Sequence, residues 1–175
     1  IAEGEVVLRV LTDRAPSRVR SVLLLEKRRD VLEDALARLG PDVPVYLAPE
    51  RVMSEVVGFP IHRGILALAA RGAEVSATEL LASLEGSARS LVVGVCGVTN
   101  HDNVGGIFRN AAAFGAGAVL LDGASCDPLY RKAIRVSVGA TIAVPFARGG
   151  TEAELTAILE HAGYTVFALT PRGDL

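Results

Sequence analysis

Cysteine and aromatic residues are scarce in this chain, and their scarcity excludes several classes of protein. The only cysteines among the 175 residues are Cys96 and Cys126, which show no C-x-x-C spacing and no histidine placed to complete a zinc set. The sequence therefore indicates neither a disulfide framework nor a metal site, and a reducing cytoplasm is the expected compartment. The aromatic residues are five Phe and three Tyr, so few rings are available to stack on nucleic-acid bases.

Long apolar runs and a strong net charge are also absent. The best apolar run, SLVVGVCGV at 90–98, ends within about ten residues, whereas a membrane-spanning helix needs about 20. Eighteen basic against twenty acidic residues give a net charge of -2, so any nucleic-acid surface must be local. The chain opens on Ile1 without an initiator Met or a signal-peptide pattern, which predicts a fragment of a longer protein.

What is present is an α/β pattern in two parts. Residues 1–72 predict a small domain of alternating helices and strands, and residues 73–87, richer in Ser, Ala and Gly, predict a linker with a capping box. Residues 88–175 predict a second domain. In the first domain, the expected helices are EVVLRVL, RRDVLEDALARLG closed by a left-handed Gly40, and ERVMSEVVG with Pro49 in its first turn; the expected strands are RVRSVLLLE, VPVYLA and ILALAA.

The second domain alternates strands and helices, which predicts a parallel sheet. The near-continuous apolar run at 90–98 is typical of a strand buried on both faces. Asn103 is expected to cap the first helix and Asp127 the second, with Pro128 at the first position of the latter. The expected order is strand 90–97, helix 104–114, strand 117–122, helix 128–137, strand 141–146, helix 152–162 and strand 164–169.

The loop after the first of these strands is a candidate site by position, because ligands bind at the carboxyl ends of parallel strands. Gly105 and Gly106 remove side chains near the start of a helix, where a phosphate can approach free backbone N–H groups. Arg109 follows one turn later, and Arg131, Lys132 and Arg135 add cations on the next helix, a local basic patch. The same residues also fit ordinary turn, cap and surface roles, and neither G-x-G-x-x-G nor G-x-x-x-x-G-K-[ST] occurs.

The segment NVGGIFRNAAAFG at 103–115 resembles the first signature of the SpoU, or TrmH, family of RNA 2'-O-ribose methyltransferases, N-x-G-x-x-x-R-x-A-x-x-x-G. All five fixed positions match. The segments DPLYRKAIRVSVGA at 127–140 and FPIHRGILALAARG at 59–72 are similar to further parts of the family. The second and third signatures, with G-x-E and S-L-N cores, do not occur before Leu175, which predicts that the carboxyl-terminal third is missing.

The resemblance implies an L30e-like RNA-binding domain over 1–72, followed by an incomplete SPOUT domain whose full form carries a carboxyl-terminal trefoil knot. It implies S-adenosyl-L-methionine as cofactor, contacted in this chain by Leu169, Thr170 and Pro171. It also implies a homodimer, and from the residues themselves we expect no membrane or metal partner. His62 and Arg63, together with Arg131 and Arg135, are the expected RNA contacts.

The activity implied by the resemblance is transfer of a methyl group to a ribose 2'-hydroxyl of rRNA or tRNA. Arg109 is the expected catalytic residue, and Asn103 is expected to orient the loop or the substrate. A guanidinium is a poor general base, so we expect Arg109 to hold the ribose-phosphate and to stabilise the developing alkoxide, which leaves the base open. The alternative is a non-catalytic RNA-binding module related to L30e and L7Ae proteins.

Overall fold

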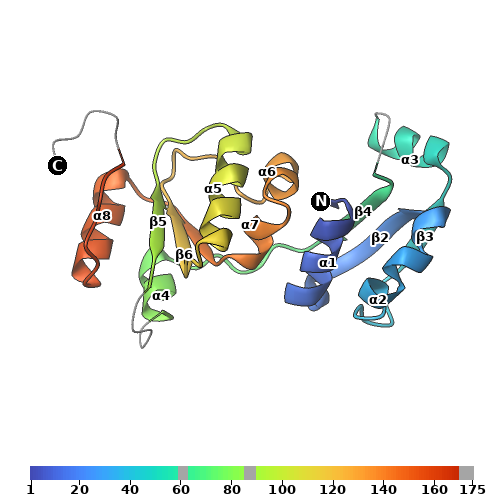
Figure 1. The fold of residues 1–175 in the computed structure, drawn as a ribbon, viewed down its shortest axis with the longest axis horizontal. Helices are drawn as coiled ribbons and strands as arrows, with labels where there is room; N and C mark the ends of the chain where they lie inside the picture. The colour runs from blue at the N-terminus through green and yellow to red at the C-terminus, as the bar shows by residue number, and fades with distance from the viewer. Residues whose placement is uncertain (59–62, 85–89, 170–175) are drawn as a thin grey trace.

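The structure is a computed structural model that describes residues 1–58, 63–84 and 90–169. Figure 1 shows two α/β units arranged along the long axis of the molecule, each built around its own sheet. No helix in these described ranges is long and apolar enough to cross a membrane.

The amino-terminal unit has a mixed four-stranded sheet with the order β1-β4-β2-β3. The strand β4 runs antiparallel to both β1 and β2, and β3 runs parallel to β2. Alternate residues of β2 and β4, such as Val22 and Leu24, are buried in the hydrophobic core on one face of the sheet. The residues between them face the other side of the sheet. The strand bounds are β1 Ala2–Glu3, β2 Val19–Leu25, β3 Val45–Ala48 and β4 Ile65–Ala69.

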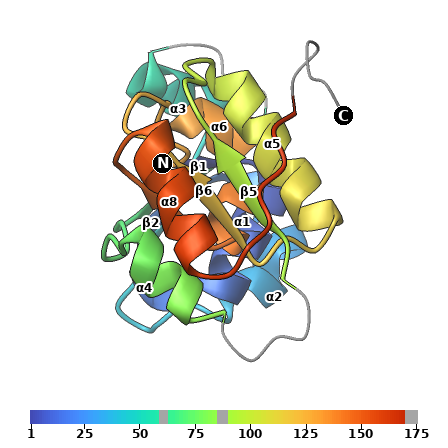
Figure 2. The ribbon, with the colours of Figure 1, turned by 90° about the vertical axis from the view of Figure 1, so that its left-hand side faces the viewer.

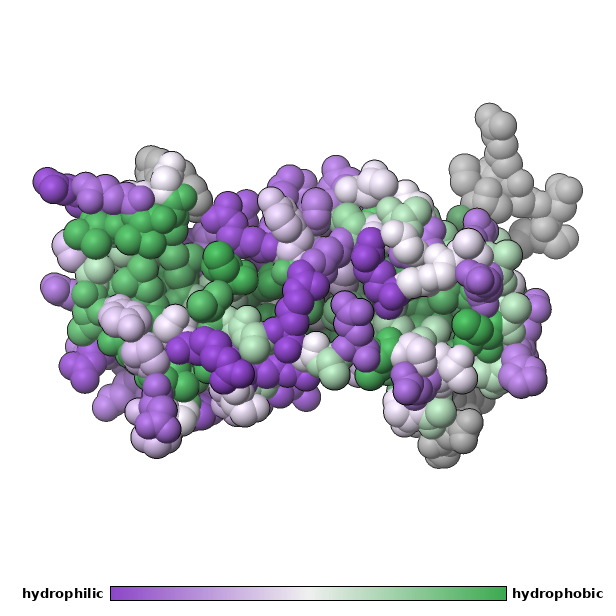
Figure 3. Space-filling model, turned by 180° about the vertical axis from the view of Figure 1, so that it is seen from behind, coloured by the Kyte–Doolittle hydropathy of each residue, from purple (hydrophilic) through white to green (hydrophobic). Residues whose placement is uncertain are grey.

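Helices cover the two faces of this sheet unequally. Val7, Leu8 and Leu11 of α1 (Glu5–Arg14) are buried against one face, while α3 (Glu50–Val57) buries Met53 against the other. Much of the second face stays open, because Leu68 is 52% exposed. Figure 3 shows hydrophobic side chains gathered on the rear of this unit.

The predicted helix over RRDVLEDALARLG is wrong in its length and in its cap. The segment forms 3-10 turns at Glu26–Arg28 and Asp30–Leu32 and a single α-helical turn, α2 (Glu33–Leu36). Gly40 is not left-handed, whereas Gly58 is, with φ 78°. Pro49 is the N-cap of α3 rather than a residue of its first turn.

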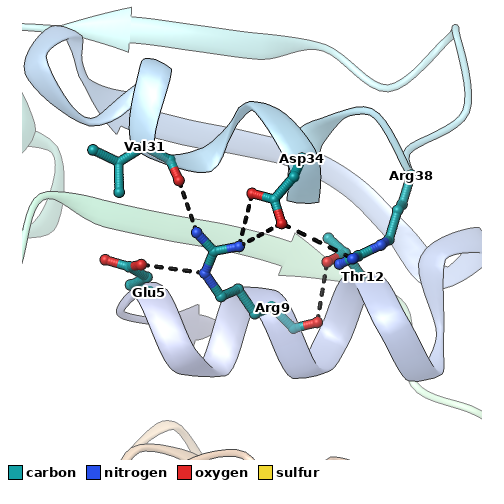
Figure 4. A network of polar contacts seen from close by, with 6 residues as sticks. All are labelled: Glu5, Arg9, Thr12, Val31, Asp34 and Arg38. Atoms are coloured by element: carbon teal, nitrogen blue, oxygen red, sulfur yellow. Dashed lines mark hydrogen bonds and ion pairs between the residues drawn. The ribbon is translucent and has the colours of Figure 1, made fainter.

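A polar network ties this segment to α1 (Figure 4). The Arg9 guanidinium donates to both carboxylate oxygens of Asp34, at 2.8 and 2.7 Å, and to the carbonyl of Val31 at 2.7 Å. The Val31 carbonyl therefore contributes to the contact with α1. The hydrogen bond from Arg9 also lowers the pKa of Asp34.

The second unit has a parallel three-stranded sheet of order β5-β6-β7, which confirms the predicted parallel arrangement. Helix α5 packs on one face of the sheet, and α4 and α8 pack on the other (Figure 2). On the α5 side, the rings of Phe108 and Phe146 meet edge-on, with their centroids 5.7 Å apart. The capping boxes at Ser76 and Thr151 are confirmed. The bounds are α4 Ala77–Ala82, β5 Val92–Val95, α5 His101–Ala113, β6 Ala118–Leu121, α6 Arg131–Val136, α7 Ala140–Ala143, β7 Phe146–Arg148 and α8 Glu152–His161.

Three predicted elements of this unit differ from the structure. The predicted strand 141–146 is mostly the helical turn α7, because Gly139 is left-handed at its N-cap and Ser137 accepts a hydrogen bond from the Thr141 amide at 3.3 Å. The predicted helix 128–137 begins only at residue 131, after Asp127 has turned back to accept from the Leu129 amide. The predicted strand 164–169 has no strand pairing.

Helix α4 lies within the segment predicted as a linker, yet it is a packed element. Leu80 and Leu81 are buried with Leu120 of β6 and Leu155 of α8. This part of the segment 73–87 therefore contributes to the core of the second unit.

The two units contact each other through α6 and α7. Ile134 of α6 is 5% exposed and belongs to the hydrophobic core of the first unit. Gly139, with φ 88°, lies so close to Val10 of α1 that a Cβ atom would meet the Val10 Cβ at 3.1 Å. An ion pair between Arg71 and Asp127 joins the chain after β4 to the loop before α6.

Candidate functional site

The candidate site lies at the carboxyl ends of β5 and β6, where α5 begins. Asn100 caps α5: its side-chain oxygen accepts from the amides of Asp102 at 2.7 Å and Asn103 at 3.3 Å. The helix starts at His101, so the prediction that Asn103 is the cap is wrong. Asn103 lies in the first turn, and its exposed side chain is left for other contacts. Asn100 followed by an acidic residue in the first turn is the signal that identifies this cap in the sequence.

The two glycines of α5 serve different purposes. A Cβ on Gly105 would lie 2.9 Å from both the Ala133 carbonyl oxygen and the Val136 Cβ, so this glycine lets α5 approach α6. A Cβ on Gly106 would meet nothing within 4 Å. The open position that the sequence analysis expected for a ligand therefore exists at Gly106 alone, and Gly105 is a packing residue.

Arg109 is exposed on α5 and makes no hydrogen bond or ion pair within the described ranges. It is seven residues beyond Asp102, so the two side chains share one side of the helix. Asn103 is six residues before Arg109, about 120° away around the helix axis. The structure thus exposes both predicted catalytic residues without placing them on the same side of α5.

A buried carboxylate that the sequence analysis did not select anchors the loop before α5. Asp122, at the end of β6, is 7% exposed. It accepts from the Gly97 amide at 3.0 Å and from the Ser125 amide and hydroxyl at 2.8 and 2.6 Å. Burial raises the pKa of Asp122, but these hydrogen bonds and the charge of Arg148 outweigh burial, so the pKa is lowered overall. An aspartate at the end of the apolar run AVLL is the available sequence signal.

Arg148, at the end of β7, fixes the neighbouring loop through backbone contacts. Its guanidinium donates to the Gly123 carbonyl at 2.9 Å and to the Ser125 carbonyl at 2.7 and 2.9 Å. The loop after β6 is therefore held both by the Asp122 carboxylate and by the Arg148 guanidinium.

The cations of α6 are engaged in ion pairs. Lys132 lies 2.7 Å from Asp102. Arg131 and Arg135 each lie 3.8 Å from a carboxylate oxygen of Glu3, a residue of the other unit that is 5% exposed. The basic patch predicted from the sequence is thus partly neutralised by Glu3 and Asp102. The roles of Arg131 and Arg135 in RNA binding stay a prediction.

The remaining predicted residues lie apart from α5 or outside the described residues. Arg63 is exposed and lies against Gly4, with its Nη1 3.0 Å from the position of a Cβ there. Leu169 is fully exposed after α8. The predicted RNA contact His62 and the predicted cofactor contacts Thr170 and Pro171 lie outside the described residues.

A separate hollow of about 540 Å³ lies between α4 and α8 at the end of β7. Its walls are mainly apolar and include Leu155, Ile158 and Gly149. It is on the side of the sheet opposite α5, so it is not continuous with the residues around Arg109. Within the described ranges, no group of His, Cys, Asp or Glu side chains is placed to hold a metal ion.

Comparison with solved structures identifies the fold. An AdoMet-bound rRNA methyltransferase from Sinorhizobium meliloti matches 91% of this chain over 57% of its own length, with a TM-score of 0.68 and 19% identity. The SpoU methyltransferase AviRb from Streptomyces viridochromogenes aligns with 90% of this chain and with 57% of its own length, with a TM-score of 0.70 and 18% identity. The architecture is thus that of the SPOUT methyltransferases, an α/β fold with a parallel sheet. The L30e-like character of the first unit stays a prediction.

Sequence comparison then identifies the family. Residues 90–174 match the SpoU rRNA Methylase family. The whole chain is 38% identical to an uncharacterized tRNA/rRNA methyltransferase of Mycobacterium tuberculosis, covering 99% of this chain and 58% of that protein. It is 30% identical over 148 residues to the 23S rRNA (guanosine-2'-O-)-methyltransferase RlmB of Escherichia coli, covering 81% of this chain and 59% of RlmB. Residues 90–174 thus belong to the SpoU methylase family, as the signature at 103–115 predicts, and the chain spans just under three fifths of these relatives.

Proposed function

We propose that the protein containing this chain transfers a methyl group from S-adenosyl-L-methionine to a ribose 2'-hydroxyl of rRNA or tRNA. The observation that carries the proposal is the family signature on α5, which leaves Arg109 exposed and unpaired among the described residues beside the open Gly106. The names of the relatives support an RNA substrate, and RlmB supports the ribose 2'-oxygen. Structural neighbours with bound AdoMet support the cofactor.

Leu169 is the described residue that we propose for cofactor binding. The fully exposed Leu169 and the 82% exposed Phe167 place apolar side chains beyond α8, and such side chains fit the flat apolar face of an adenine. Thr170 and Pro171 complete the proposed set. When bound, the cofactor supplies an electrophilic methyl group on a sulfonium ion.

Arg109 acts on the acceptor side of the reaction. Its guanidinium stays protonated, so it holds the ribose-phosphate and stabilises the negative charge that develops on the 2'-oxygen. Positioning matters as much as charge, since in-line displacement requires the acceptor oxygen and the methyl group to be aligned. The ties from Asp122 and Arg148 keep the loop before α5 fixed, and Asn103 is available at the helix start to orient the substrate.

The first test of this function is a methyl-transfer assay with the complete protein, labelled S-adenosyl-L-methionine and fractionated rRNA and tRNA. Nuclease mapping then locates the label, and we expect it on riboses. Label on bases would refute ribose methylation. RNA binding without any transfer would instead support the non-catalytic RNA-binding module.

We also propose that the complete protein is a homodimer. The exposed end of α5, where Phe114 is 80% exposed, provides apolar surface that suits a partner subunit. Sedimentation equilibrium tests this proposal, and a monomer at micromolar concentration would refute it.

A further inference from the structure

A pair of aromatic rings, a half-buried histidine and an exposed tyrosine, lies beside the start of α5. The rings of His101, the first residue of α5, and Tyr130, the N-cap of α6, have centroids 4.3 Å apart and planes inclined by 40°. Tyr130 is 53% exposed. These residues follow β5 and β6 in the chain, so the pair lies at the carboxyl edge of the sheet, where ligands of open α/β folds bind.

Packing and hydrogen bonding within the chain do not account for the exposed Tyr130 ring. Its hydroxyl has no hydrogen-bond partner within the described part of the chain, whereas the Tyr164 hydroxyl lies 2.5 Å from Ser90. The tilted contact with His101 supports the ring, and about half of the residue's surface stays open to solvent. A fixed ring with a free surface meets the requirement of a stacking partner for a planar ligand.

Lys132, which is paired with Asp102, and Arg109, unpaired within the described ranges, are two cations available to the phosphates of a nucleotide stacked on the pair. Lys132 lies two residues beyond Tyr130 and is 48% exposed in its ion pair with Asp102. Arg109 lies eight residues beyond His101, which is about 12 Å along the helix axis. That distance corresponds to roughly three or four stacked nucleotides. One strand of RNA can therefore stack a base on the aromatic pair while a ribose further along lies at Arg109.

We propose that His101 and Tyr130 form a stacking platform for a base of single-stranded RNA, a few nucleotides from the ribose that is methylated. This inference rests on the proposed function and adds to it a binding site for a flanking nucleotide. Stacking tolerates any base, because every base has a π-face. The platform therefore contributes affinity and favours unpaired RNA without selecting one sequence.

The test is binding of a short unstructured RNA to the complete protein, measured by fluorescence anisotropy. Tyr130→Ala should weaken binding about tenfold, within the range measured for lost base stacking, while Tyr130→Phe keeps the ring and should bind like wild type. Loss of affinity in Tyr130→Phe equal to that in Tyr130→Ala, or unchanged affinity in Tyr130→Ala, would overturn the platform.

Methylation kinetics separate this inference from the proposed function. Tyr130→Ala should raise KM about tenfold with kcat nearly unchanged, because the ring lies away from the reacting ribose. Ribose methylation by wild type with an unaltered KM in Tyr130→Ala would overturn the platform and leave the function intact. Methylation of bases alone would refute the function, and the platform would then be judged on the anisotropy result. Absence of RNA binding by wild type would overturn both.

Discussion

The two sides of helix α5 show how one element divides stability from function. On the inner side, Val104 and Phe108 are fully buried, and Gly105 allows close contact with α6. On the outer side, Gly106 is open and Arg109 reaches solvent without a partner among the described residues. Both sides belong to one signature, so a fixed position in such a pattern can reflect packing or chemistry. Substitutions on each side are expected to separate these two roles.

The largest effect is expected on the outer side, at Arg109. Arg109→Ala in the complete protein should lower turnover about 100-fold or more, because a donor to the transition state is lost. The melting temperature should hardly change, since the side chain is exposed and forms no ion pair within the described ranges. Methyl transfer and thermal unfolding, measured together, check both statements.

Arg51→Ala provides a matched control for this prediction. Arg51 is an exposed arginine on α3 of the other unit, with an ion pair to Glu55 at 3.2 Å. Its substitution should leave turnover unchanged. Similar turnover in the Arg51 and Arg109 variants would make Arg109 a surface residue without a catalytic role.

The next effect is expected on the inner side, at Gly105. Gly105→Ala pushes a methyl group against the Ala133 carbonyl oxygen and should destabilise the fold by about 1–2 kcal/mol, after the better helix propensity of alanine is counted. For a chain of this size, the melting temperature should fall by roughly 2–8 °C. Differential scanning calorimetry measures the change.

Gly106→Ala is the control for the inner-side prediction, because its methyl group meets no atom within 4 Å. Alanine should then stabilise the helix by about 0.5–1 kcal/mol. Equal destabilisation by the two variants would show that the difference between the sides of α5 is not steric.

A smaller effect is expected where α6 meets the first unit. Glu3→Gln removes the charge that faces Arg131 and Arg135 and should lower the free energy of unfolding by about 1 kcal/mol, because both ion pairs are long at 3.8 Å. If these arginines also contact RNA, the same variant should bind RNA more tightly. Urea denaturation and RNA anisotropy measure the two quantities.

Glu55→Gln is the control for the interface between the units, since Glu55 is 65% exposed in its pair with Arg51. No measurable loss of stability is expected for such a surface pair. If Glu55→Gln lowered the free energy of unfolding as much as Glu3→Gln, the location of Glu3 between the units would not account for its effect.

The smallest effect concerns acid stability at the loop before α5. The folded-state pKa of Asp122 lies below its ordinary value of 3.8, so the carboxylate form stabilises the fold. This contribution is fully present above the unfolded pKa and is lost as the pH falls through the folded pKa. The difference in unfolding free energy between wild type and Asp122→Asn should be constant near neutral pH and shrink below pH 3.8. A difference that grows on acidification would contradict the lowered pKa.

Local patterns predicted much of the second unit and the position of the site. The strand before the site and the capping box at Thr151 are set by neighbouring residues, and the structure contains both. The predicted burial of that strand on both faces is wrong, because β5 is an edge strand in which Val95 alone is buried. The predicted cap of α5 is three residues too late, because Asn100 and Asn103 are both good caps and the acidic residue that follows Asn100 is the signal in its favour.

Long-range contacts limited what the sequence could predict. Glu3 and Arg135 are far apart in the chain, and no local pattern indicates that they form a pair. The carbonyl of Val31 accepts from Arg9 of a distant helix, a contact that no local pattern in this segment indicates. The burial of Asp122 likewise depends on Ser125 and Gly97, which come together only when β5 and β6 pair.

The placement of Ile134 in the core of the first unit has a consequence for how the chain responds to proteolysis. The extended segment 70–76 joins the units, and the ion pair between Arg71 and Asp127 lies at its start. A protease that cleaves this segment after residue 71 would leave two fragments that stay associated through Ile134, Leu129 and Ile142. Separating them would expose these side chains to water, so each fragment expressed alone should be prone to aggregation while the nicked pair remains soluble.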